Sequence, residues 1–134
     1  MPVLELGPDP AEVPAARHWV LRRCEEDGVE EDVRDVVELL TSELVANAYQ
    51  HGRPPVRIRV SRVEVPADSA TGRVVRLELE VTDMGPGAPV VREMGVDALG
   101  GRGMALVDML AAAWGVRPAA SPGTGKTVWC RLAA

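Results

Sequence analysis

A helix with polar residues inside its apolar stripe is the feature that most constrains this 134-residue sequence. Between Gly28 and Gly52, apolar residues recur at the spacing of one helical face, at Val33, Val36, Val37, Leu40 and Leu44. This periodicity predicts an amphipathic helix over residues 30–50. Asn47 falls inside the stripe, and Glu43 lies on its border one turn earlier. Burying an amide and a carboxylate without partners costs roughly a few kcal/mol, so we expect a ligand above them, such as a hydrated cation that carries a phosphate.

The rest of the chain shows alternating helix and strand signals. A first helix follows the N-cap candidate Asp9 and runs to about Asp27, and the awkward position of Pro14 places its regular start near Val13. A third helix begins at Met104. Strands are expected at residues 3–6, 56–60, 75–81, 114–116 and 127–132. This order predicts an α/β (α+β) two-layer sandwich over residues 1–134, a single domain with a mixed, largely antiparallel sheet and three helices on one face.

Two local features of the sheet are also predicted. The alternation of apolar residues slips between Val60 and Val63, which predicts a bulge or a strand end near Ser61. Residues 66–72 are rich in turn formers and read as a long hairpin loop.

Composition narrows the class of protein. Apolar residues make up 46% of the chain and Phe is absent, so Val, Leu and Ala must fill the core. A net charge of −5 provides no basic surface for nucleic acid. No apolar run approaches the roughly 20 residues of a membrane span, and the N-terminus lacks a signal-peptide pattern. We therefore expect a cytoplasmic protein in which Cys24 and Cys130 are buried thiols, with a disulfide between them as the alternative.

Two glycine-rich segments carry candidate binding groups. Asp83 ends a strand and is followed by Gly85 and Gly87, so a buried carboxylate there can accept a hydrogen bond from an exocyclic amine such as that of adenine. The alternative for Asp83 is a simple Asx-turn at the strand end. Residues 100–103 are Gly-Gly-Arg-Gly and open a helix, where free N–H groups form an anion site; an ordinary flexible loop is the alternative.

The segment Gly-Thr-Gly-Lys-Thr at residues 123–127 is not a P-loop. That motif would require a glycine where the chain has Ala120, and it leads into a helix. Here the segment leads into a predicted strand.

Taken in order, these segments resemble the ATP-binding fold shared by gyrase, a heat-shock chaperone, histidine kinases and MutL, known as the GHKL or Bergerat fold. The resemblance rests on the helix with Glu43 and Asn47, on Asp83-x-Gly-x-Gly, on Gly101-Arg102-Gly103 and on the terminal Gly-Lys-Thr-Val, and it covers nearly the whole chain. Within that group the sequence is similar to small stand-alone bacterial anti-sigma-factor serine/threonine kinases. The run Ser-Glu-Leu-Val-Ala-Asn-Ala at residues 42–48 and the run Gly-Gly-Arg-Gly-Met-Ala-Leu-Val look like that branch.

The resemblance implies a role for each matching residue. Glu43 would be the catalytic base, and Asn47 would be the side-chain ligand of Mg²⁺ in the Mg·ATP site. Asp83 would bind the adenine amine, with Gly85 and Gly87 beside it and Thr127 supporting that network. Gly101, Arg102 and Gly103 would lie at the phosphates, and residues 88–99 would form a mobile lid. Strand parity leaves open whether Thr127 faces the same side as Asp83.

The function implied is that of an anti-sigma factor that phosphorylates a small anti-anti-sigma (STAS-type) partner and regulates transcription through a sigma factor. The resemblance also implies a homodimer, and neither nucleic acid nor a membrane is an expected partner. The alternative is a nucleotide-gated binding module with little or no kinase activity. A plain ATPase is a third class, disfavoured because no coupled domain is visible.

Overall fold

The computed structural model describes residues 2–67, 72–85, 102–119 and 125–133. Three helices are described, namely α1 (Val13–Glu26), α2 (Glu31–His51) and α3 (Arg102–Leu110), with a short 3₁₀ turn, η1 (Pro10–Glu12), before α1. The strands are β1 (Val3–Leu6), β2 (Val56–Pro66), β3 (Arg73–Asp83), β4 (Ala113–Pro118) and β5 (Lys126–Ala133). They form one sheet in the order β1-β2-β3-β5-β4.

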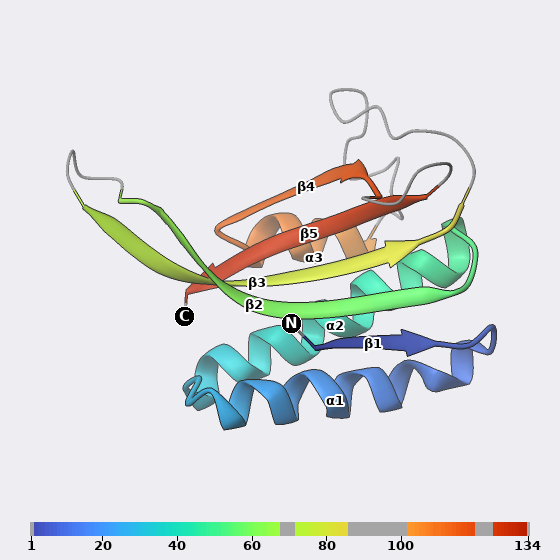
Figure 1. The fold of residues 1–134 in the computed structure, drawn as a ribbon, viewed down its shortest axis with the longest axis horizontal. Coiled ribbons are helices and arrows are strands. Elements are labelled where there is room, and N and C mark those ends of the chain that lie inside the picture. The colour runs from blue at the N-terminus through green and yellow to red at the C-terminus, as the bar shows by residue number, and fades with distance from the viewer. Residues whose placement is uncertain (1, 68–71, 86–101, 120–124, 134) are drawn as a thin grey trace.

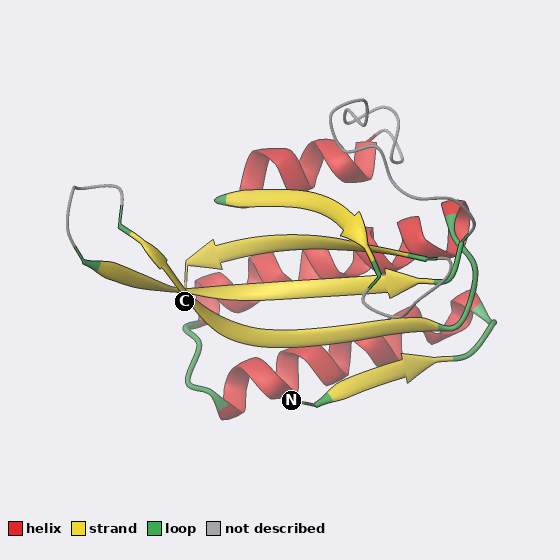
Figure 2. Ribbon diagram, turned by 45° about the horizontal axis from the view of Figure 1, so that its top comes forward, coloured by secondary structure: helices red, strands yellow, loops and turns green. Residues whose placement is uncertain are grey.

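The helices cover one face of this sheet and leave the other face open (Figure 1). Figure 2 shows the same two layers from a second direction. This arrangement confirms the predicted α+β sandwich. The prediction of a mixed sheet is wrong in one respect: every pairing among the described strands is antiparallel.

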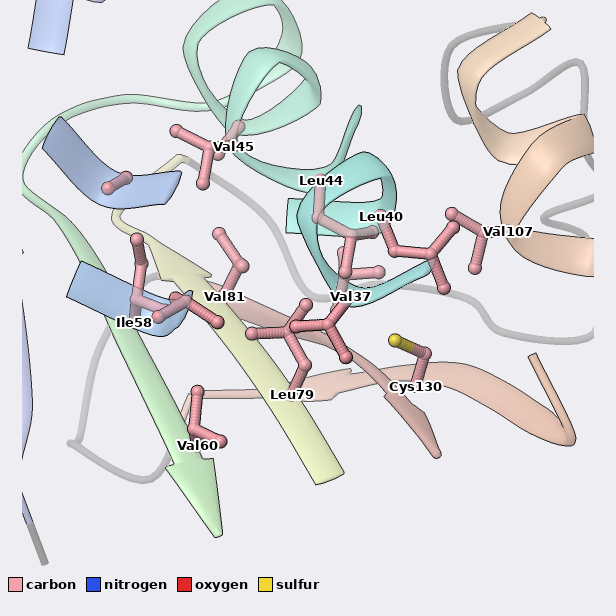
Figure 3. Packing of buried hydrophobic residues seen from close by; sticks show 14 of the residues in the cluster. Val37, Leu40, Leu44, Val45, Ile58, Val60, Leu79, Val81, Val107 and Cys130 are labelled. Atoms are coloured by element: carbon pink, nitrogen blue, oxygen red, sulfur yellow. The ribbon is translucent and has the colours of Figure 1, made fainter. Parts of the chain in front are cut away.

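Alternation along the strands explains why only one face is covered. Figure 3 shows apolar side chains of α2, including Val37, Leu40 and Leu44, packed against Leu79 and Val81 of β3. Branched aliphatic residues dominate this core, as expected for a chain without Phe. The opposite side chains of β3 and β5 are mostly polar, and they form ion pairs on the open face. Burial of the α2 stripe thus sets the two-layer architecture.

The predicted break in β2 near Ser61 is wrong. The pairing of β2 with β3 runs without interruption from Arg57 opposite Thr82 to Pro66 opposite Arg73. The apolar residues change face after Val60 because the hairpin extends past the helical layer, as Figure 1 shows. Apolar residues no longer face a helix there, so the sequence pattern changes without any inserted residue.

Two predicted helix boundaries are close to those observed. The side chain of Asp9 caps η1 by accepting a hydrogen bond from the N–H of Ala11 at 2.9 Å, and α1 itself begins at Val13. The predicted helix over residues 30–50 is observed as α2 and ends one residue later, at His51. In the described part of the chain, no helix is both long and apolar enough to cross a membrane.

The two cysteines are free and buried, as predicted. Burial raises the pKa of the Cys24 thiol to about 11 and that of the Cys130 thiol to about 12. Because each folded-state pKa is higher than the unfolded value of about 8.5, the un-ionised thiols make their full contribution to the free energy of unfolding below that pH. That contribution is lost as the pH rises toward the folded values.

We expect neither thiol to react with a thiol-specific reagent at pH 8 in the folded protein, because both are buried and un-ionised. Both should react once the protein is unfolded in urea. Native-state labelling followed by mass determination checks this, and rapid stoichiometric labelling of either cysteine without unfolding would contradict it. The urea midpoint should also fall as the pH is raised above about 9.

Candidate functional site

Asn47 is the least satisfied polar residue of the described core. It lies on the buried side of α2 and is 6% exposed. Neither its amide oxygen nor its amide nitrogen has a hydrogen-bond partner within the described residues. A buried amide without partners is costly, so the position calls for a ligand that supplies them.

Glu43 lies one helical turn before Asn47 and faces α3. A Cβ atom placed on Gly103 would lie 2.6 Å from Oε2 of Glu43. The carboxylate therefore packs against the first turn of α3, where the absence of a side chain at Gly103 leaves it room. The structure thus brings Glu43 together with Gly103, the last residue of the predicted phosphate segment.

Asp83 ends β3 beside the C-terminal end of α2. A Cβ atom on Gly52 would lie only 2.2 Å from the carboxyl carbon of Asp83, and the N–H of Met84 donates to the carbonyl of Arg53 at 2.8 Å. The glycine that ends α2 is thus also the glycine that admits the carboxylate. In the sequence, Gly52 only bounded the region of the predicted helix, and nothing in the sequence pattern indicated its contact with Asp83.

Both carboxylate oxygens of Asp83 already have partners. Oδ1 accepts a hydrogen bond from the N–H of Gly85 at 2.7 Å, which is the Asx-turn considered as the alternative. Oδ2 lies 2.8 Å from Nζ of Lys126, the first residue of β5. The turn holds the carboxylate in place and leaves its remaining lone pairs available.

Thr127 does not contact Asp83, so the structure gives no support to the predicted role of Thr127 beside that carboxylate. Its hydroxyl lies 2.7 Å from that of Thr82, on the open face of the sheet. Successive side chains of a strand point to opposite faces, so Thr82 and Asp83 diverge, and so do Thr127 and Lys126. Lys126 is the residue of β5 that pairs with Asp83 in register.

The other predicted residues are only partly described. Gly87, Gly101 and the lid at residues 88–99 lie outside the described residues. Arg102 is the first residue of α3, which begins two residues before the predicted start at Met104, and only the backbone of Arg102 is described. Gly85 is buried beside Asp83 and donates its N–H to that carboxylate.

A cavity of about 490 Å³ lies elsewhere, on the open face of the sheet. Its buried carboxylate is Glu80, which Arg59 and Arg117 hold at 2.8 and 2.6 Å. Arg57, the third arginine of the lining, pairs with Glu5 at 2.9 Å, so each charged side chain of the lining has an ionic partner. The unpaired amide of Asn47, and not this cavity, marks the place that lacks a partner.

Asn47→Ala should not lower the free energy of unfolding in the absence of nucleotide, because the change removes an unpaired buried amide and Ala is the better helix former. It should weaken the stabilisation that a bound nucleotide provides. Urea unfolding with and without Mg·ATP checks both effects. Gln50→Ala, an exposed change in the same helix, is the control. Unchanged stabilisation by Mg·ATP in the Asn47 variant would remove this residue from the site.

The comparisons with known proteins agree with this geometry. The family model of the histidine kinase-like ATPase domain matches residues 6–132, which include Glu43, Asn47 and Asp83. No curated protein matches the chain significantly. A match over nearly the whole length indicates ATP binding and is consistent with the five-stranded sheet and three helices. The chain belongs to the family of histidine kinase-like ATPase domains.

Proposed function

We propose that the protein binds Mg·ATP between α2, the end of β3 and the start of α3, and transfers the γ-phosphoryl group to a serine or threonine of a protein partner. In this reaction the partner's hydroxyl oxygen forms a bond to the γ-phosphorus. The bond from that phosphorus to the β–γ bridging oxygen breaks, and ADP leaves. Glu43 takes the hydroxyl proton.

The unpaired amide of Asn47 is the observation that carries the proposal. Its oxygen is a hard ligand of the kind that Mg²⁺ prefers, and Mg²⁺ commonly keeps several waters while binding only one or two protein oxygens plus phosphate. A single amide fits such a site, and no group of three or more potential metal-ligating side chains occurs among the described residues. When bound, Mg²⁺ would neutralise charge on the phosphates.

Glu43 is suited to the role of base by its position. It precedes Asn47 by one turn of α2, and its carboxylate lies against Gly103 in the first turn of α3. Free N–H groups at a helix start favour an anion, so a phosphate bound there would lie close to Glu43. The carboxylate would orient the attacking hydroxyl and accept its proton.

The proposed partner is an anti-anti-sigma protein of the STAS type, with a sigma factor as a second partner and a homodimer as the working unit. Support for this part comes from the sequence resemblance alone. Co-purification from cells in the presence and absence of ADP would identify the proteins bound. Recovery of neither a STAS-type protein nor a sigma factor would argue against this assignment.

Glu43→Gln decides between a kinase and a nucleotide-gated binding module. Loss of a general base should slow phosphoryl transfer by about 10²–10⁴-fold at saturating ATP. Mg·ATP should still bind, because the proposed cation ligand is Asn47. Transfer of labelled phosphate to the partner measures the rate, and calorimetry measures the binding.

Glu38→Gln is the matched control, since Glu38 is exposed on the same helix and touches no part of the proposed site. Its transfer rate should equal that of the wild type. A Glu43 variant that transfers phosphate at the wild-type rate would show that Glu43 is not the base. A wild type that binds ATP and transfers no phosphate to any partner would favour the binding module.

A further inference from the structure

Lys126 is the only lysine among the 15 basic residues of the chain. The other basic residues are arginines, and several of them form ion pairs on the open face. Lys126 instead lies opposite Asp83 in the register of β5 and β3, and its side chain is 12% exposed. The one lysine ammonium group of the protein is therefore placed at the candidate base-binding carboxylate.

The ion pair presents an acceptor and a donor side by side. Oδ2 of Asp83 lies 2.8 Å from Nζ of Lys126. A carboxylate has about four lone-pair sites, and the described contacts use two of them. An ammonium group has three N–H donors, and its one described acceptor is Asp83. Asp83 and Lys126 can thus each form a further hydrogen bond, to a ligand that has a donor beside an acceptor, while their ion pair is kept.

The edge of adenine that carries the exocyclic amine has a donor beside an acceptor, which matches the acceptor and donor of the ion pair. The amine is a donor, and the adjacent ring nitrogen N1 is an acceptor. The side chain of Asp83 is 1% exposed and that of Lys126 is 12% exposed, so the ammonium group is the more accessible member of the pair. If the amine donates to Asp83, N1 comes within reach of Lys126.

We infer that Lys126 is a specificity-determining residue that donates a hydrogen bond to N1 of the adenine ring while Asp83 accepts one from the amine. This inference rests on the proposed binding of ATP at Asp83. Arg at this position would present a wide planar fork, whereas Lys presents a compact donor on a flexible stem. The competing explanation is that Lys126 only neutralises the charge of Asp83.

Binding of ATP and of its 1-deaza analogue, which has a C–H group in place of N1, separates the two explanations. Both ligands keep the amine and the phosphates, so they differ only at the atom assigned to Lys126. The wild-type protein should bind ATP about ten- to hundredfold more tightly than 1-deaza-ATP, the range for one hydrogen bond to a charged group. Calorimetry with Mg²⁺ present measures both affinities. Equal affinities would overturn the inference, and this comparison needs no variant.

Lys126→Met keeps an unbranched side chain of nearly the same length and removes the donor. Its absolute affinity for ATP will also reflect the loss of the counter-ion of Asp83, so the informative quantity is the ratio of affinities for ATP and 1-deaza-ATP. That ratio should fall to about one if Lys126 contacts N1. Arg131→Met, on the same strand but on the open face, is the matched control and should keep the wild-type ratio. A folded Lys126 variant that keeps the wild-type ratio would overturn the inference.

A third ligand separates failure of this inference from failure of the proposed site. Purine riboside triphosphate keeps N1 but lacks the amine, so it should bind the wild type more weakly than ATP if Asp83 accepts from that amine. If the wild type binds ATP more tightly than purine riboside triphosphate but binds ATP and 1-deaza-ATP equally well, the proposed site is retained and the role of Lys126 is overturned. If the wild type binds ATP and purine riboside triphosphate equally well, or binds no ATP, the placement of adenine at Asp83 is overturned, and the inference is overturned with it.

Discussion

The close approach of the end of α2 to the end of β3 is the constraint on which the candidate site depends. The carboxyl group of Asp83 occupies the space that a side chain at Gly52 would need, and a backbone hydrogen bond from Met84 to Arg53 fixes the two segments together. This contact places Asp83 at the C-terminal end of the helix that carries Glu43 and Asn47. A similar contact, between Glu43 and Gly103, brings in the start of α3. Glycines permit both approaches because they carry no Cβ atom.

The two faces of the sheet solve different physical problems. On the covered face, α2 buries its stripe against the aliphatic residues of β2, β3 and β5, and this burial drives folding. On the open face, Glu78 and Glu80 are buried carboxylates, which would be costly without counter-ions. Arg131 pairs with Glu78 at 2.9 Å and also lies over the ring of Trp129, 4.7 Å from its centroid. The open face is thus satisfied internally, whereas Asn47 on the covered side is not.

Asp83 illustrates how one residue serves structure and binding together. Its hydrogen bond from Gly85 is an ordinary Asx-turn, and its ion pair with Lys126 joins β3 to β5 at the sheet end. Neither contact exhausts the acceptor capacity of the carboxylate. The structural explanation and the functional one were posed as alternatives for this residue, and the geometry is compatible with both.

The position of Pro14 was sufficient to place the start of α1 at Val13. Periodicity was sufficient to predict the α2 stripe and the two-layer order of elements, because local side-chain spacing decides these features. It also predicted that Asn47 is buried, since the residue lies within the stripe. Tertiary structure decided the rest. The continuous register through Ser61 depends on where the helical layer ends, which strand alternation cannot reveal. The choice of Lys126 over Thr127 as the neighbour of Asp83 depends on how β5 pairs with β3, since a shift of one residue exchanges the faces of a strand.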